Sequence, residues 1–174
     1  MKSFLLSTTL LLAAFGLASA QAPKKAPASP PADTTVAVDG GALTIKYASP
    51  SVKGRKIFGG LVPYGQPWRA GANNATAFHT DVDLSIGTVM VPKGDYTLYV
   101  LPTEKEWSLI INKQTGQWGT EYSEAKDLGR VKMTLTSSPA LIESYKMTLS
   151  GSGKSAKLQL EWEHSIATVA IKVK

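Results

Sequence analysis

The residues best suited to chemistry in this chain include a short alternating stretch, FHTDVDL. If this stretch is a strand, His79, Asp81 and Asp83 lie on one of its faces. An imidazole and two carboxylates are acid, base or metal-ligand groups. Residues two apart on a strand lie ~6.6 Å apart and point in parallel, so they rarely converge on one ion. A polar stripe facing solvent is the alternative, and we predict no metal site.

A second candidate site lies in residues 59–76, GGLVPYGQPWRAGANNAT, which have neither a strand period nor a helix period. An arginine in such a segment offers five fixed donors for a carboxylate, a phosphate or loop carbonyls. Asparagine amides can bind hydroxyl groups or cap a turn. Ordered loops are where binding sites usually lie. The candidate ligand-binding residues are Tyr64, Trp68, Arg69, Asn73, Asn74 and, from a later loop, Trp118.

A structural plug is the alternative interpretation of residues 59–76. In that case Tyr64 and Trp68 close one end of the domain, and Arg69 bonds to carbonyls that the irregular backbone leaves unpaired. Long loops without secondary structure are usually either functional or packed by their own side chains. The two interpretations differ in whether the guanidinium finds its partners inside the protein.

Catalysis by a nucleophile has little support in the sequence. There is no cysteine, no GxSxG turn, and no glycine-rich phosphate loop before a helix. We therefore predict no cofactor and favour a non-catalytic binding or structural module. The alternative is a hydrolase-like enzyme that uses Arg69, His79 and either Asp81 or Asp83. That enzyme requires the three groups to converge on one pocket, whereas a binding module requires only Arg69, Asn73 and exposed aromatic rings around a cleft.

The first 20 residues predict a secretory signal peptide. A short basic start is followed by an apolar run from Phe4 to Leu17 and by the small residues ASA, which predicts cleavage between Ala20 and Gln21. A membrane anchor is the alternative, but the apolar run is short for a span of ~20 residues. We expect a periplasmic or secreted protein without a membrane span after cleavage. The absence of cysteine excludes disulfides and a lipid-modified cysteine.

Residues 21–35, QAPKKAPASPPADTT, contain four prolines and no large apolar residue, which predicts a disordered linker. From residue 36 onward apolar residues recur with a period of two, and turn residues separate the runs. This pattern predicts an all-β domain over 36–174, a single antiparallel β-sandwich or barrel-like fold of eight or so short strands. Trp107 and Trp162 are predicted core residues, and Trp118 is a predicted surface residue.

The charge of the chain is +6, and loss of Lys2 with the signal peptide leaves +5. The basic residues are spread along the chain without interleaved aromatic residues, so we do not expect nucleic-acid binding. The partner predicted from the candidate site is a small polar ligand, a glycan or a protein. A protein partner at an exposed strand edge is a further alternative.

Two long motifs resemble the DUF2911 family, exported bacterial proteins of unknown function. The motifs are SPSVKGRKIFGGLVPYGQPWRAGANNAT and VPKGDYTLYVLPTEKEWSLIINKQTGQWG. The resemblance extends over roughly Thr44 to Val173. Members of the family often carry an acid after the GAN tripeptide, where this chain has Asn74, so a catalytic carboxylate at that position would be absent. The resemblance implies no established activity.

Overall fold

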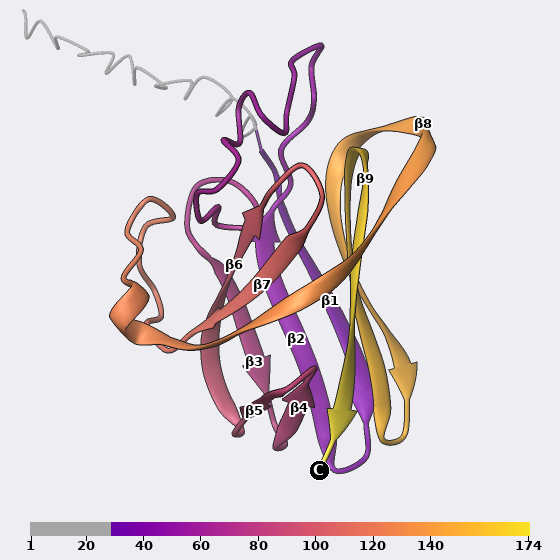
Figure 1. Cartoon of the computed structure of the whole chain (residues 1–174). Helices are drawn as coiled ribbons and strands as arrows, with labels where there is room; N and C mark the ends of the chain where they lie inside the picture. The colour runs from indigo at the N-terminus through magenta and orange to yellow at the C-terminus, as the bar shows by residue number, and fades with distance from the viewer. Residues whose placement is uncertain (1–28) are drawn as a thin grey trace, which may run out of the picture.

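The computed structural model describes residues 29–174, which form one antiparallel sheet of nine strands (Figure 1). The strand order is β1-β2-β3-β6-β7-β8-β9-β4-β5, and the sheet is not closed into a barrel because β1 and β5 stand at its two ends. The predicted all-β antiparallel class is confirmed. The elements are β1 (Pro31–Val38), β2 (Gly41–Ala48), β3 (Thr76–Thr80), β4 (Leu84–Ile86), β5 (Val89–Val91), β6 (Gly94–Pro102), β7 (Trp107–Asn112), η1 (Glu124–Lys126), β8 (Asp127–Ser152) and β9 (Ser155–Val173).

The last two strands are much longer than the sequence pattern predicts. β8 has 26 residues and β9 has 19, and both bend over at one end of the molecule (Figure 1). At the bend the pairing register shifts on either side of Ile142, whose partner Glu163 has a φ of 55°. The start of β8, residues 127–133, pairs with β7, and the end of β9, residues 171–173, pairs with β4. The bent pair therefore carries the sheet over onto itself and encloses the core.

The strand β1 corrects the predicted boundary of the linker. Residues 31–35 are not linker, because they pair with β2 from Pro31 opposite Ala48 to Thr35 opposite Thr44. Proline is tolerated as the first residue of a strand at the end of a sheet, where its missing N–H breaks no ladder bond. Thr34 also accepts a hydrogen bond from the amide of Leu149 on β8, at 3.0 Å. The predicted signal peptide and residues 21–28 lie outside the described residues.

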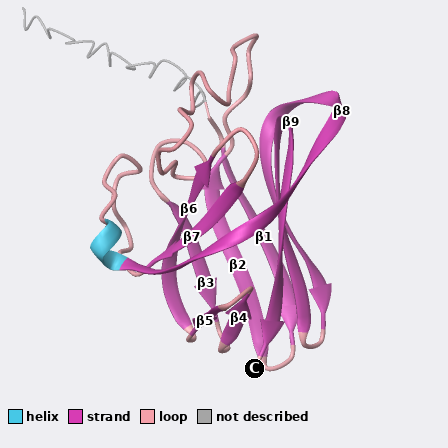
Figure 2. Cartoon of the chain, viewed as in Figure 1, coloured by secondary structure: helices cyan, strands magenta, loops and turns pink. Residues whose placement is uncertain are grey.

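The two ends of the sheet differ in the length of their loops. Tight turns lie at the end where the chain terminates, and residues 49–75, between β2 and β3, lie at the opposite end (Figure 2). Residues 113–123, between β7 and η1, form a second long loop. In the described part of the chain no helix is long and apolar enough to cross a membrane. The fold therefore gathers its irregular segments where the candidate site lies.

An aromatic cluster fills the core beneath these loops. Trp107 and Trp162 are 3% and 1% exposed, which confirms them as core residues. Trp68, from the first loop, stacks on Trp162 with ring centroids 5.6 Å apart and planes inclined by 18°. Tyr145 and Phe58 contact the Trp68 ring edge-on, at 5.0 and 6.1 Å. Trp68 is therefore a core residue supplied by a loop.

We expect Trp68→Ala to lower the free energy of unfolding by about 3–5 kcal/mol, because it removes a ring from a closed cluster and leaves a cavity. Urea denaturation of the chain without its signal peptide measures the change. Trp118→Ala is the matched control, since Trp118 is 51% exposed and surface substitutions stay within about 0.5 kcal/mol. Equal losses in the two variants would contradict the assignment of Trp68 to the core.

Candidate functional site

The loop of residues 49–75 is fixed at three points, to two strands of the sheet and to the second loop. Near its start, Pro50 accepts a hydrogen bond from the amide of Tyr145 on β8, at 2.8 Å. In its middle, Trp68 and Val100 of β6 exchange two backbone hydrogen bonds of 2.7 and 2.8 Å. Near its end, the carbonyl of Asn73 accepts from the amide of Gly119, at 3.1 Å. A loop held at three points keeps the side chains between them in place.

The backbone around Arg69 adopts conformations that side chains other than glycine disfavour. Ala70 has a φ of 50° and Asn73 a φ of 61°. An alanine in the left-handed region is uncommon, and such residues cost on the order of 1–3 kcal/mol each. Trp68 donates its indole N–H to the carbonyl of Gly71, at 3.1 Å, across the tight turn. The strained turn directs Arg69 away from the core that Trp68 enters.

The guanidinium of Arg69 is partly buried and incompletely paired. Its Nε is covered by protein but has no hydrogen-bond partner among residues 29–174. The side chain passes over Gly119 so closely that a Cβ at that position would lie 1.9 Å from the Arg69 Cδ. Burial lowers the pKa of Arg69 from its usual value, opposed by the nearby Tyr99 hydroxyl. Within the described part of the chain, no carboxylate forms an ion pair with this partly desolvated cation.

Two clefts border Arg69. The first, here called the Gln66 cleft, has a volume of about 270 Å³ and is lined by residues that include Gln66, Arg69, Thr120 and Tyr122. The second, called the Arg55 cleft, has a volume of about 290 Å³ and is lined by residues that include Arg55, Trp68, Arg69 and Asn73. Neither lining contains an aspartate or a glutamate. Both clefts therefore favour an anionic group.

A polar network holds the second loop against the sheet. Gln117 donates to the hydroxyl of Tyr99 at 2.9 Å, and Tyr99 donates to the carbonyl of Glu121 at 2.8 Å. Tyr122 donates to Asp127 at 2.7 Å, and burial followed by this hydrogen bond raises the pKa of Tyr122 to about 12. The second loop therefore supplies a fixed wall to the Gln66 cleft.

The structure brings together only part of the ligand-binding set predicted from the sequence. Trp68, Arg69 and Asn73 all line the Arg55 cleft. Asn74 lines a neighbouring cleft and pairs with Trp118 in an isolated antiparallel bridge. Tyr64 is 38% exposed and covers Gly59, where a Cβ would lie 2.7 Å from its ring, and it lines neither the Gln66 nor the Arg55 cleft.

Arg55 is the residue that the sequence reasoning missed. Its Nε and Nη2 donate to the carbonyls of Val52 and Ser51, at 3.1 and 2.6 Å. These bonds hold its cationic head at the rim of the Arg55 cleft. The signal available in the sequence was its position in the first long motif, just before residues 59–76, which carry most of the expected site.

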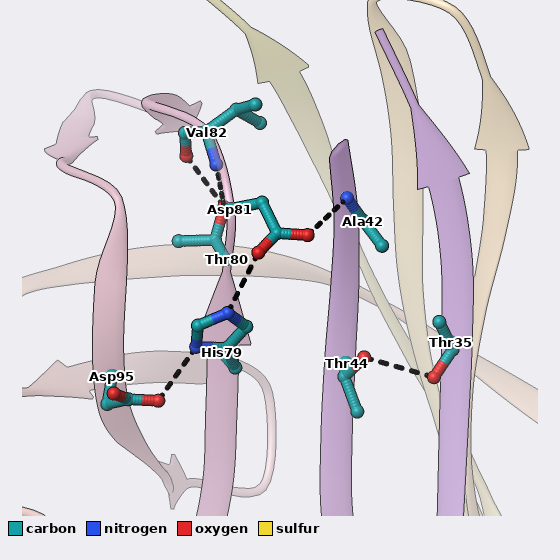
Figure 3. A network of polar contacts seen from close by, with 8 residues as sticks. All are labelled: Thr35, Ala42, Thr44, His79, Thr80, Asp81, Val82 and Asp95. Atoms are coloured by element: carbon teal, nitrogen blue, oxygen red, sulfur yellow. Dashed lines mark hydrogen bonds and ion pairs between the residues drawn. The ribbon is translucent and has the colours of Figure 1, made fainter. Parts of the chain in front are cut away.

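Two of the three alternative catalytic residues, His79 and Asp81, form a separate cluster with Asp95 of β6 at the end of β3 (Figure 3). His79 Nδ1 lies 2.8 Å from Asp95, and its Nε2 lies 3.1 Å from Asp81, whose other oxygen accepts from the amide of Ala42. Asp83 is not part of the cluster and instead accepts from the amide of Lys93, at 2.8 Å. Two carboxylates on one imidazole favour the doubly protonated ring, since both nitrogens then donate.

Arg69 and His79 lie beside different parts of β6. His79 pairs with Asp95, whereas Trp68, beside Arg69, pairs with Val100. Five strand residues correspond to roughly 16 Å. The cleft beside His79 does not include Arg69 in its lining. Among the described residues, no group of three or more His, Cys, Asp or Glu side chains is arranged to hold a metal ion.

The comparison with protein families matches residues 29–171 to a single family model, described as a protein of unknown function, DUF2911. The chain belongs to the DUF2911 family. The match begins upstream of Thr44, where the resemblance was expected to start, and includes all of β1. No curated protein and no solved structure matches the chain. The DUF2911 name assigns no activity, so the chemistry has to be argued from the site of this member.

In this DUF2911 domain the arrangement around Arg69 is suited to holding an anion rather than to transferring a proton. An arginine stays protonated and presents a fixed fork of donors to a carboxylate or phosphate. The His79 cluster, by contrast, is open to solvent, with side-chain exposures of 47% for His79, 49% for Asp81 and 73% for Asp95.

The pKa of His79 is expected to lie above 6.5, because the hydrogen bond to Asp95, and then that to Asp81, favours the charged ring. A raised pKa stabilises the folded DUF2911 domain fully below about pH 6.5. This contribution is lost as the pH rises through the folded-state pKa. NMR titration of the ring protons measures it, and we expect Asp95→Asn to bring the pKa down.

Asp83→Asn is the matched control for that titration, because Asp83 does not contact His79. It should leave the pKa of the imidazole where the unsubstituted protein has it. A folded-state pKa at or below 6.5, or one that Asp95→Asn leaves unchanged, would contradict the paired geometry at His79.

Proposed function

We propose that this protein is an exported, non-catalytic binding module whose ligand site lies at residues 59–76 and is centred on Arg69. The ligand carries an anionic group that the guanidinium binds. Export is supported by the signal-peptide pattern of residues 1–20, which places the module in the periplasm or outside the cell. Asn73 beside Arg69, and the exposed Trp118 near it, supply further polar and aromatic contacts.

One observation carries this proposal: the buried Nε of Arg69 has no acceptor among residues 29–174, while the side chain lines two clefts whose linings contain no carboxylate. A buried donor without a partner costs about 1–3 kcal/mol, and more when it is charged. A carboxylate or phosphate oxygen in either cleft would supply the acceptors, and an arginine binds such groups through two parallel bonds.

The structural plug accounts for Trp68 but not for Arg69. The indole of Trp68 lies in the aromatic cluster, and its N–H donates to the carbonyl of Gly71. A plug also requires Arg69 to bond to loop carbonyls, and its Nε bonds to none among the described residues. The two neighbours therefore have different roles, one in the core and one at the clefts.

The hydrolase-like alternative has less support than the binding module. It requires Arg69, His79 and an aspartate around one pocket. The residues of β6 that pair with His79 and with Trp68, next to Arg69, lie roughly 16 Å apart along that strand. His79 also engages both of its nitrogens with carboxylates, which leaves neither nitrogen free to accept a proton from a substrate. No contact in the described residues favours this alternative.

We expect small anions to raise the melting temperature of the chain without its signal peptide, because a ligand that binds only the folded state stabilises it. The probes are acetate, citrate, inorganic phosphate and galacturonate at constant ionic strength. A probe at 100 times its Kd contributes about 2.7 kcal/mol. Arg69→Gln should abolish the shift, because it removes the charge and keeps a polar side chain of similar reach.

Lys105→Gln is the matched control, since it removes one positive charge from an exposed residue that lines neither cleft. This variant should keep the full shift. If none of the probes shifts the unsubstituted protein, or if Lys105→Gln loses as much as Arg69→Gln, the proposed site is wrong.

A further inference from the structure

A third cleft lies next to the Arg55 cleft, on the other side of Asn73. It has a volume of about 340 Å³ and is here called the Lys46 cleft, after the lysine of β2 that lines it. Ser29, Ala72 and Asn73 line both the Arg55 cleft and the Lys46 cleft. Since Arg69 already joins the Gln66 and Arg55 clefts, the three clefts form a row across the end of the sheet.

Positive charge recurs along this row. Arg69 lines the first two clefts, Arg55 the second, and Lys46 the third. None of the three linings contains an aspartate or a glutamate. Lys46 and Ala48 point to one face of β2, ~6.6 Å apart, and Ala48 accepts a hydrogen bond from the amide of Ala72 at 3.2 Å. No one of the three linings contains both Arg69 and Lys46, so an anion within a single cleft does not contact both.

Small residues make up much of the Lys46 cleft, since Ala48, Ala72, Ala75 and Ala77 line it. An aromatic ring stands beside this lining. Trp118 pairs with Asn74 in an antiparallel bridge, and residues paired in this way point their side chains to the same side. The indole of Trp118 is 51% exposed. A lining of small residues, an exposed indole and two asparagine amides fit sugar rings, whose apolar faces stack on aromatic side chains and whose hydroxyls bond to amides.

We propose that the row of three clefts binds an extended acidic oligosaccharide, with carboxylates at Arg69 and Lys46 and a sugar face on Trp118. This inference rests on the proposed function, because Arg69 belongs to both. It adds that the ligand has several charged units and that its other end lies at Lys46. An acidic peptide has less support, because it would leave the exposed indole and the two amides without matched partners.

The test is a calorimetric titration with galacturonate oligomers of one, three and six units at constant ionic strength. We expect the affinity to rise about tenfold or more from the monomer to the hexamer, since linked units bind with a high effective concentration. Lys46→Gln should remove most of this gain and leave the monomer unaffected. Arg69→Gln should weaken every length, Trp118→Ala should weaken the longer oligomers, and Lys105→Gln should change none of them.

Three outcomes overturn this inference, and they are distinguishable from failure of the proposed function. Binding that depends on Arg69 but not on oligomer length would overturn the extended ligand and leave the anion site standing. A hexamer of glutamate that binds as tightly as the sugar hexamer would overturn the assignment to a sugar. If neither galacturonate oligomers nor small anions bind, both the inference and the proposed function fail.

Discussion

The stack of Trp68 on Trp162 is the interaction on which the rest of this site depends. It joins a loop without regular structure to the bend of the long strands β8 and β9. The backbone amide and carbonyl of Trp68 also both form hydrogen bonds with Val100 of β6. With its neighbour fixed in this way, Arg69 has little freedom to turn toward bulk water. The core contact thus determines where the cation stands.

This arrangement is unfavourable for stability taken by itself. The unpaired Nε of Arg69 and the left-handed conformations of Ala70 and Asn73 each cost on the order of 1–3 kcal/mol. Burial of the Trp68 ring and the hydrogen bonds that fix the loop at three points act in the other direction. Strained backbone and unpaired donors of this kind are often found at functional sites, where a bound ligand supplies the missing hydrogen-bond acceptors.

Local pattern in the sequence predicted much of the fold. Alternating apolar residues predicted the antiparallel all-β class, and Trp107 and Trp162 followed as core residues. The SSPA stretch at residues 137–140 has the composition of a turn, yet it lies within β8, because the register shift at the bend absorbs it. The composition of residues 31–35 predicted a linker, but these residues form the start of β1. A strand at the end of a sheet is paired along one edge only, and one half-buried face is enough to hold it, so it needs few large apolar residues.

The site was harder to predict, because its members meet through pairings between distant strands. One of the two carboxylates that contact His79 is Asp95, which lies opposite it on β6 and not in its own alternating stretch. Arg55 and Lys46 belong to the row of clefts only because the end of β2 lies against Ala72. The sequence did single out Trp68 and Arg69, but it did not separate a core residue from its neighbour at the clefts. That distinction depends on which partners each side chain finds.

The measurement that tests this account most directly is the melting temperature of Arg69→Met without ligand. Methionine keeps the apolar stem that lies over Gly119 and removes only the charged head. Because that head lacks internal acceptors, we predict an unchanged or higher melting temperature than that of the unsubstituted protein. A fall of several degrees, equivalent to a loss of ~2–4 kcal/mol, would show that the guanidinium is bonded within the protein. The site would then be a structural plug.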